Sequence, residues 1–348
     1  MSKCIYLKKT DQELTFDAEE HIFPAGIGGI TKLKLGMVSD EFNTKIFSPI
    51  ELDFMRNSPI SIPRQIQGPG KRGSLSEKKA TKSNVHVLYK NGNEEAALGY
   101  LSLGHPYLIP QIKIINKKEV HISFDKNEGD YLQQITKFIN ELKVFNNQYT
   151  TILDKDLPID DILIGFYNGK WYLAKNNNCP EPVLSEFISH IVSEIDEKKH
   201  QIKYDSSLVT CHQKMTFNME NVYRVIAKIV FNFLAHSKGT DFVLQECFDP
   251  IREWIVKGGE NRFVADVDQN KTGAIFQKQI FPKYSHWLGI TKVNNKLIGN
   301  ICLYGSYQYA VMLSDSFMGN YECDGLICDW QLRREFRLID FISNICKG

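Results

Sequence analysis

Side chains suited to hydrolytic chemistry gather in two short groups near the N-terminus. The first is Glu20-His21, followed by Pro24, and the second is the segment 38–43, which ends at Asn43; a Gly28-Gly29 pair lies between them. A histidine can accept or donate a proton near neutral pH, and carboxylate and amide oxygens are ligands that Mg²⁺ binds. Hydrolysis of a phosphodiester needs a base to activate water and a divalent cation to neutralise charge. These residues form the candidate site.

The order and spacing of these groups resemble an HNH endonuclease module. The resemblance is to the branch whose core contains Cys-x-x-Cys, Glu-His-x-x-Pro, a Gly-Gly turn, Val-Cys-x-x-Cys-Asn and a Phe-Gly-x-x-Ile-Asp-like helical segment, at whose place residues 47–51 stand. It implies an N-terminal ββα-metal module, with His21 as general base and Glu20 and Asn43 as ligands of one Mg²⁺ (or Mn²⁺) ion. It also implies an endonuclease that hydrolyses DNA phosphodiester bonds.

Three of the four cysteines that bind structural zinc in this branch are absent. Cys4 remains, whereas Leu7, Ser39 and Phe42 occupy the other places. We therefore expect no structural zinc, and we expect Leu7 and Phe42 to brace the module by packing against each other or against the second domain. Gly36 also stands where the family usually has an asparagine.

The backbone must bring the two groups together, because Asn43 lies twenty-two residues after His21. A hairpin that turns at Gly28-Gly29 and leads into the start of a helix would do this. Neighbouring residues of a regular strand point to opposite faces. Glu20 and His21 can therefore share one site only if the backbone before Pro24 is irregular.

A basic segment follows between residues 56 and 82. It has seven basic residues against one acid, a local charge of +6 in a chain whose net charge is +1. Phosphates would be attracted to it. The residues that we expect to contact nucleic acid are Arg56, Arg64, Lys71 and Arg72. The glycines and proline of residues 68–74 are also typical of a solvated linker, and both interpretations can hold together.

Length and composition set the remaining limits. A chain of 348 residues predicts about two domains, and 43% hydrophobic with 24% charged residues is ordinary globular composition. No apolar run approaches the roughly 20 residues of a membrane span, and a signal-peptide pattern is absent. Eight scattered cysteines show neither metal-type nor disulfide-type spacing, which fits reduced thiols. We expect a cytoplasmic protein without membrane association.

The pattern changes near residue 80, which predicts an HNH-like domain over 1–80 and a larger mixed α+β domain over 81–348. Strands are expected at 85–89, 112–114 and 120–124, a hairpin turn at Asn168-Gly169, a meander over 286–313, and helices at 130–145, 184–195, 218–236, 250–257 and 332–345. Helix 218–236 should be central, with Asn221, Arg224 and Lys228 opposite its apolar face. The larger domain could position substrate, regulate the nuclease or bind a partner.

These features predict a metal-dependent nuclease of α+β class with duplex DNA as the favoured substrate. A solitary nuclease would threaten its host, so a regulatory protein partner or a homo-oligomer is expected to restrain it, as in bacterial antiphage defence. RNA stays open as a substrate, because a base and one metal ion serve either backbone. The rival interpretation is a degenerate module that binds nucleic acid or protein without cutting.

Overall fold

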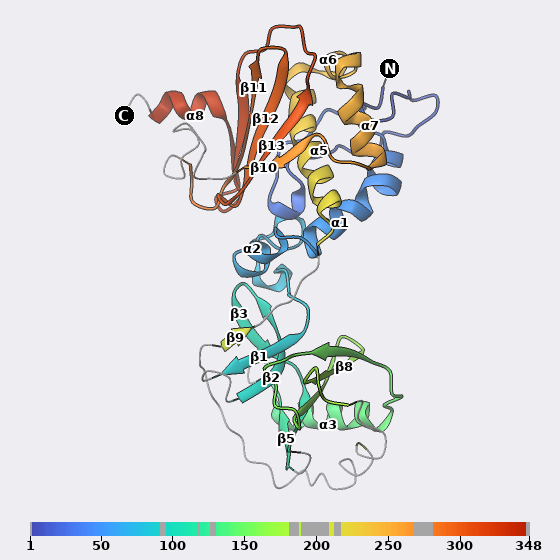
Figure 1. The fold of residues 1–348 in the computed structure, drawn as a ribbon, viewed down its shortest axis with the longest axis vertical. Helices are drawn as coiled ribbons and strands as arrows, with labels where there is room; N and C mark the ends of the chain where they lie inside the picture. The colour runs from blue at the N-terminus through green and yellow to red at the C-terminus, as the bar shows by residue number, and fades with distance from the viewer. Residues whose placement is uncertain are drawn as a thin grey trace. The chain divides into compact units, whose positions relative to one another are not determined.

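The chain folds as two compact units. The computed structural model describes residues 2–90, 95–116, 119–125, 130–180, 188, 209–211, 217–267 and 281–345. Unit 1 comprises residues 1–81 and 215–348, and unit 2 comprises residues 82–214. The α+β class is confirmed, since both units combine sheets with helices (Figure 1). Residues 81–348 are not one body: residues 215–348 belong with the N-terminal segment, because their apolar side chains share one core with it.

Unit 1 is built on a six-stranded antiparallel sheet in the order β10-β13-β12-β11-β14-β15. Its strands are β10 (Val264–Asp266), β11 (His286–Val293), β12 (Lys296–Leu303), β13 (Tyr307–Ser314), β14 (Asp324–Asp329) and β15 (Arg334–Arg337). The expected meander corresponds to β11–β13. The last helix, α8 (Leu338–Ile345), begins later than expected, because residues 334–337 pair with β14 as a strand.

Helix α5 (Met219–Lys238) lies between this sheet and the N-terminal helix α1 (Ser48–Arg56), as Figure 1 shows. Asn218 caps its start, accepting a hydrogen bond from the backbone of Asn221. The helices α6 (Thr240–Val243) and α7 (Asp249–Lys257) and the 3₁₀ turn η5 (Glu246–Phe248) follow it. Of the expected polar face of α5, Arg224 and Lys228 are buried and Asn221 is half-buried. Asn232, on the same helix, is fully buried as well.

The N-terminal segment forms a short hairpin followed by helices. His21 pairs with Lys32, and the backbone N–H of Leu33 donates to the carbonyl of Glu20 at 2.7 Å. The 3₁₀ turn η1 (Ala25–Ile27) lies inside the hairpin. The segments after it are the π-helical turn η2 (Phe42–Phe47), α1, α2 (Ser61–Ile66) and the 3₁₀ turns η3 (Lys71–Gly73) and η4 (Glu77–Lys79). Hairpin and helix therefore occur in the expected order.

The two turns at which the sequence resemblance places zinc cysteines, residues 4–7 and 39–42, are each closed by a hydrogen bond. The N–H of Leu7 donates to Sγ of Cys4 at 3.5 Å, and the N–H of Phe42 donates to Oγ of Ser39 at 3.3 Å. Phe42 is fully buried, and its ring stacks on Tyr6 with centroids 4.0 Å apart. Tyr6 in turn contacts Phe231 of α5. Apolar packing against the C-terminal part of the chain thus braces this region, as expected of Phe42.

The described part of unit 2 contains two sheets, whose strands pair mostly antiparallel, and helix α3 (Tyr131–Lys143). The four-stranded sheet contains β1 (His86–Lys90), β2 (Glu95–Ser102), β3 (His105–Leu108) and β9 (Val209–Cys211). The five-stranded sheet contains β4 (Gln111–Ile115), β5 (Glu119–Ser123), β6 (Tyr149–Leu153), β7 (Ile162–Tyr167) and β8 (Lys170–Lys175). Helix α3 shares an apolar core with the latter sheet. The Asn168-Gly169 turn is confirmed, with positive φ at both residues.

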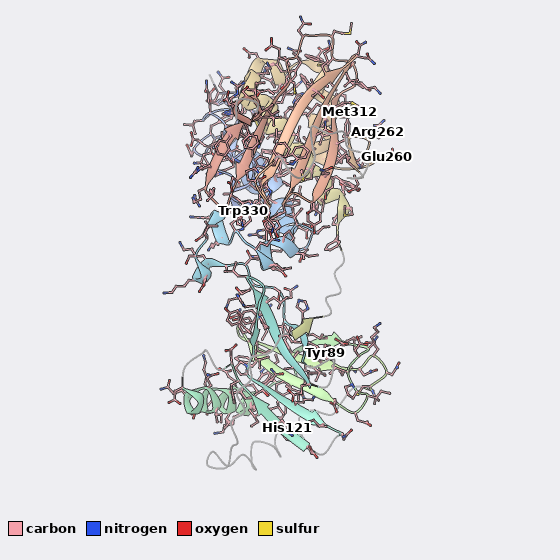
Figure 2. The ribbon with its side chains drawn as sticks, turned by 90° about the vertical axis from the view of Figure 1, so that its left-hand side faces the viewer. Tyr89, His121, Glu260, Arg262, Met312 and Trp330 are labelled. Atoms are coloured by element: carbon pink, nitrogen blue, oxygen red, sulfur yellow. The ribbon has the colours of Figure 1, made fainter. Side chains whose placement is uncertain are left out.

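Several other sequence-based expectations can be placed. The helix expected at 184–195 lies outside the described residues, apart from residue 188. His121 is exposed on β5 (Figure 2), and its Nε2 atom lies 3.7 Å from Oε2 of Glu119. No helix in the described part of the chain combines the length and the apolar character that a membrane crossing requires.

Candidate active site

A buried ammonium group lies at the centre of the candidate site. Nζ of Lys228, on α5, is 2.6 Å from Oε1 of Glu20 in the hairpin and 2.6 Å from Oε1 of Glu51 in α1. The exposed fractions of the three side chains are 3%, 14% and 26%. Two carboxylates therefore converge on one cation in a largely water-excluded place, where ionic interactions are stronger than at the surface.

The charges of this cluster depend on one another. Burial disfavours the charged form of Lys228, but Glu20 and Glu51 together raise its pKa, so the lysine is held as an ammonium ion. Burial raises the pKa of Glu20, Lys228 opposes this effect, and Glu51 adds to it as a like charge. The second carboxylate, Glu51, is thus unfavourable for Glu20 and tolerable only because a cation lies between them.

Asn43 joins the cluster from the first turn of η2. Its side chain lies close enough to Glu20 to lower the pKa of that carboxyl, so it favours the carboxylate form. Its Oδ1 atom is buried and has no hydrogen-bond partner among the described residues. A buried acceptor without a hydrogen-bond donor costs roughly 1–3 kcal/mol of stability. This oxygen is therefore suited to coordinate a cation or to accept a hydrogen bond from a water molecule. The hairpin and the helix therefore bring Glu20 and Asn43 together, as the sequence predicted.

His21 is held by its backbone. Its carbonyl oxygen accepts a hydrogen bond of 2.9 Å from Nδ2 of Asn232 on α5, and Oδ1 of Asn232 accepts one of 2.6 Å from the Tyr6 hydroxyl. Within the described residues the imidazole itself forms no hydrogen bond. Burial lowers the pKa of His21, Lys32 lowers it further, and Glu335 and Glu51 oppose this change. A half-buried, neutral imidazole can accept a proton.

The hairpin turn requires both of its glycines. Gly28 has φ +99°, and a Cβ atom there would lie 2.4 Å from Cβ of Trp330. Figure 2 labels this tryptophan in unit 1. A Cβ on Gly29 would lie 1.8 Å from the carbonyl oxygen of Phe23. Gly28 therefore lets the C-terminal segment approach the turn closely, and Gly29 lets the hairpin pack against its own Phe23.

Strand β15 also fixes the returning arm of the hairpin. The carboxylate of Glu335 accepts hydrogen bonds from the backbone N–H groups of Ile30 and Thr31, at 3.0 and 2.6 Å. Charge-assisted bonds of this kind are stronger than neutral ones. The hairpin is thus positioned from both sides, by α5 through Asn232 and by β15 through Glu335.

The candidate nucleic-acid residues divide into two groups. Arg64 is 6% exposed, and its guanidinium donates to the carbonyls of Gly26 and Met55 at 2.9 and 2.7 Å, so its main contacts are structural ones inside the unit. The other three expected contacts, Arg56, Lys71 and Arg72, are exposed. Lys71 and Arg72 belong to η3, which packs on η1 at the tip of the hairpin. They therefore lie close to the hairpin that carries the candidate site.

The side-chain oxygens of Glu20, Glu51 and Asn43 show which divalent cation the site would suit. Glu20 and Glu51 already place oxygens around a single cation, the Lys228 ammonium, and the Asn43 amide oxygen beside them has no partner among the described residues. No group of three or more His, Cys, Asp or Glu side chains within the described ranges is placed to hold a metal ion. Mg²⁺ commonly takes one or two carboxylates and keeps several waters. The donor set therefore fits Mg²⁺ or Mn²⁺ better than zinc.

Sequence reasoning missed two members of the site. Glu51 stands at the acidic end of the segment 47–51, where the HNH branch has an aspartate, so the resemblance itself could have indicated it. Lys228 was recognised only as part of the polar face of a helix. The signal was that this helix has apolar residues on most of its remaining surface, so its polar face had to meet other polar groups inside the protein.

Neither a protein-family model, nor a curated protein, nor a solved structure matches this chain. The function must therefore be argued from the geometry of the site.

Proposed function

We propose that unit 1 is a metal-dependent endonuclease of the HNH type that hydrolyses DNA phosphodiester bonds. One observation carries the proposal: the carboxylates of Glu20 and Glu51, with Asn43 close to Glu20, converge from a hairpin and the following helix. His21 follows Glu20 in the same hairpin, and burial lowers its pKa. Convergent acid and amide oxygens and a neutral imidazole on the same hairpin are the two kinds of group that phosphodiester hydrolysis requires.

His21 is the general base in this proposal. Its neutral imidazole takes a proton from the attacking water, while the bond from Asn232 to its backbone carbonyl keeps the residue in place. Glu20, Asn43 and Glu51 would hold the ion. A bound Mg²⁺ or Mn²⁺ would neutralise charge on the scissile phosphate and on the leaving oxygen. Lys71 and Arg72, on the hairpin side of the unit, would attract the phosphate backbone.

The cellular setting is part of the proposal. The nuclease would act on duplex DNA in the cytoplasm and be restrained by a regulatory protein or by formation of a homo-oligomer, as in antiphage defence. Unit 2 would position the substrate or receive the regulatory signal. Unrestricted degradation of plain DNA by the purified chain would contradict restraint by a homo-oligomer and would leave restraint by a separate regulatory protein.

The test is cleavage of supercoiled plasmid, linear duplex, single-stranded DNA and structured RNA with Mg²⁺ or Mn²⁺. The intact protein is compared with His21→Ala and with His121→Ala, in which an exposed histidine of unit 2 is removed. Cleavage that is abolished in His21→Ala and kept in His121→Ala supports the assignment. Cleavage that survives in His21→Ala rejects it, and the substrate that is cut decides between DNA and RNA.

A second candidate function is a degenerate module that binds nucleic acid or protein without cutting. It is favoured by the same lysine that completes the site, because Lys228 already supplies a positive charge between Glu20 and Glu51. Salt-dependent DNA binding with no cleavage on any of the four substrates, and equal binding by His21→Ala, would support this alternative.

A further inference from the structure

We infer that Lys228 is the resident counter-ion of the proposed metal site, so that a divalent cation binds only when it displaces the Lys228 ammonium from Glu20 and Glu51. This inference rests on the proposed function and deepens it, because it names a residue of the chain that competes with the metal ion.

The contacts of Lys228 are those that a cation would make. Its Nζ is 2.6 Å from one oxygen of each carboxylate, and the Lys228 side chain is only 3% exposed. The ammonium group also lies 4.6 Å from the centroid of the Phe47 ring, so aromatic packing encloses it on a further side. Lys228 is therefore fixed in the site, unlike a surface lysine that moves freely in solvent.

Competition follows from the charges. A divalent ion that used the same carboxylate oxygens would lie within a few ångströms of the ammonium, at a place where little water screens the repulsion. Two carboxylates cannot fully compensate a monovalent and a divalent cation together. The buried Oδ1 of Asn43 adds a neutral donor that the ammonium does not use. Metal affinity should therefore be limited by the free energy needed to release Lys228.

Direct measurement of metal binding tests this inference. Mn²⁺ binding to the full chain is followed by electron paramagnetic resonance, and Mg²⁺ binding by calorimetry, in the intact protein, Lys228→Met and Lys228→Arg. Lys238→Met is the matched control, because Lys238 is an exposed residue of the same helix. Lys228→Met should bind Mn²⁺ at least tenfold more tightly than the intact protein. Lys228→Arg and Lys238→Met should bind it as the intact protein does.

A second substitution locates the site. Glu51→Gln placed on Lys228→Met should remove the gain in Mn²⁺ affinity, because it removes one of the two carboxylates. Unchanged or weaker binding by a folded Lys228→Met would overturn the inference, since the ammonium would then be orienting the carboxylates for the metal. The same holds if the gain persists after Glu51→Gln, because the Mn²⁺ would then bind elsewhere.

The intact protein offers a test that does not depend on folding of the variant. Lysine labelled with ¹⁵N on the side chain should show a slowly exchanging ammonium signal for Lys228, assigned by its loss in Lys228→Arg, and Mg²⁺ should shift or broaden it. Binding of Mn²⁺ or Mg²⁺ that leaves this signal unchanged would overturn the inference.

Failure of the inference and failure of the proposed function give different results. Tighter metal binding by Lys228→Met without DNA cleavage by any form of the chain would support the competition and reject the nuclease. Cleavage by the intact protein, together with equal metal affinity in the intact protein and Lys228→Met, would support the nuclease and reject the competition.

Discussion

Nε2 of His286, at the start of β11, lies 2.9 Å from the carbonyl oxygen of Ile27 in the hairpin turn. The other ring nitrogen, Nδ1, accepts a hydrogen bond of 2.9 Å from the backbone N–H of Tyr304. These two bonds require a neutral imidazole with its proton on Nε2. The sheet of unit 1 therefore holds the hairpin that carries Glu20 and His21 through a histidine that must stay uncharged.

Acidification should destabilise the protein through His286. Burial lowers the pKa of this histidine from 6.5 to about 3. Between these values the unfolded chain binds a proton that the native state does not, so stability is fully present above pH 6.5 and falls as the pH decreases toward 3. The slope should reach about 1.4 kcal/mol per pH unit.

Urea unfolding between pH 7 and pH 5 measures this slope, because most carboxylates have not yet titrated there. His286→Gln should be less stable at pH 7 and lose much of the pH dependence. His121→Gln, with its exposed side chain, should keep the slope of the intact protein. An unaltered slope in His286→Gln would mean that another group is responsible.

Removal of the buried ammonium should cost considerable stability. Lys228→Met leaves Glu20 and Glu51 next to each other without a cation, and breaking a buried ion pair in this way should cost about 3 kcal/mol. Adding Glu51→Gln should recover part of the loss, since it removes the repulsion between the carboxylates. Urea unfolding of both variants and of Lys238→Met checks this. A double variant no more stable than the single one would contradict the repulsion.

Substitution of the turn glycine should be costly for two reasons. Gly28→Ala forces a Cβ onto Trp330 and strains a positive φ, and the two effects together should cost about 3 kcal/mol. Gly259→Ala is the matched control in the same unit, because Gly259 has φ +106° and no described atom lies within 4 Å of the position that a Cβ would occupy. It should cost only about 1 kcal/mol. Equal losses by thermal unfolding would remove the argument for close packing.

DNA binding should depend on the exposed basic residues of η3. Replacing Lys71 and Arg72 together by Ala should weaken duplex binding roughly tenfold and lower the slope of log affinity against log salt by about 2. Lys257→Ala, at an exposed ion pair of α7, should change neither quantity. Fluorescence anisotropy across a salt series measures both. A slope that stays the same in the η3 variant would exclude phosphate contact by these two residues.

Arg64→Ala should behave differently from the η3 variant. Its guanidinium donates to two backbone carbonyls inside the unit, so the substitution should lower the stability of unit 1 by about 2 kcal/mol while the salt slope of DNA binding is kept. Thermal unfolding and anisotropy on the same sample separate the two effects. A lower slope of log affinity against log salt with unchanged stability would mean that Arg64 contacts phosphate.

Local patterns predicted part of the regular elements, and the strands β2, β6 and β14 are among those that they missed. Helix α5 follows from apolar residues at helical spacing and an Asn218 cap, and the β7–β8 hairpin follows from Asn168-Gly169, because these signals act over only a few residues. Strand β14 escaped detection because all six of its residues are buried, so it lacks the alternation that marks a strand with one exposed face.

The sequence by itself determined the residues of the hairpin and the helix that follows it, and it predicted that Glu20 and Asn43 would meet. Only the tertiary structure decided what faces them. Lys228 reaches Glu20 across 208 residues of chain, and Arg64 turns inward although its neighbours in the basic segment are exposed. Periodicity and capping report on neighbours along the chain. The partner of a buried charge is instead set by how distant elements pack, because an ion inside a protein must find its counter-ion wherever the fold provides one.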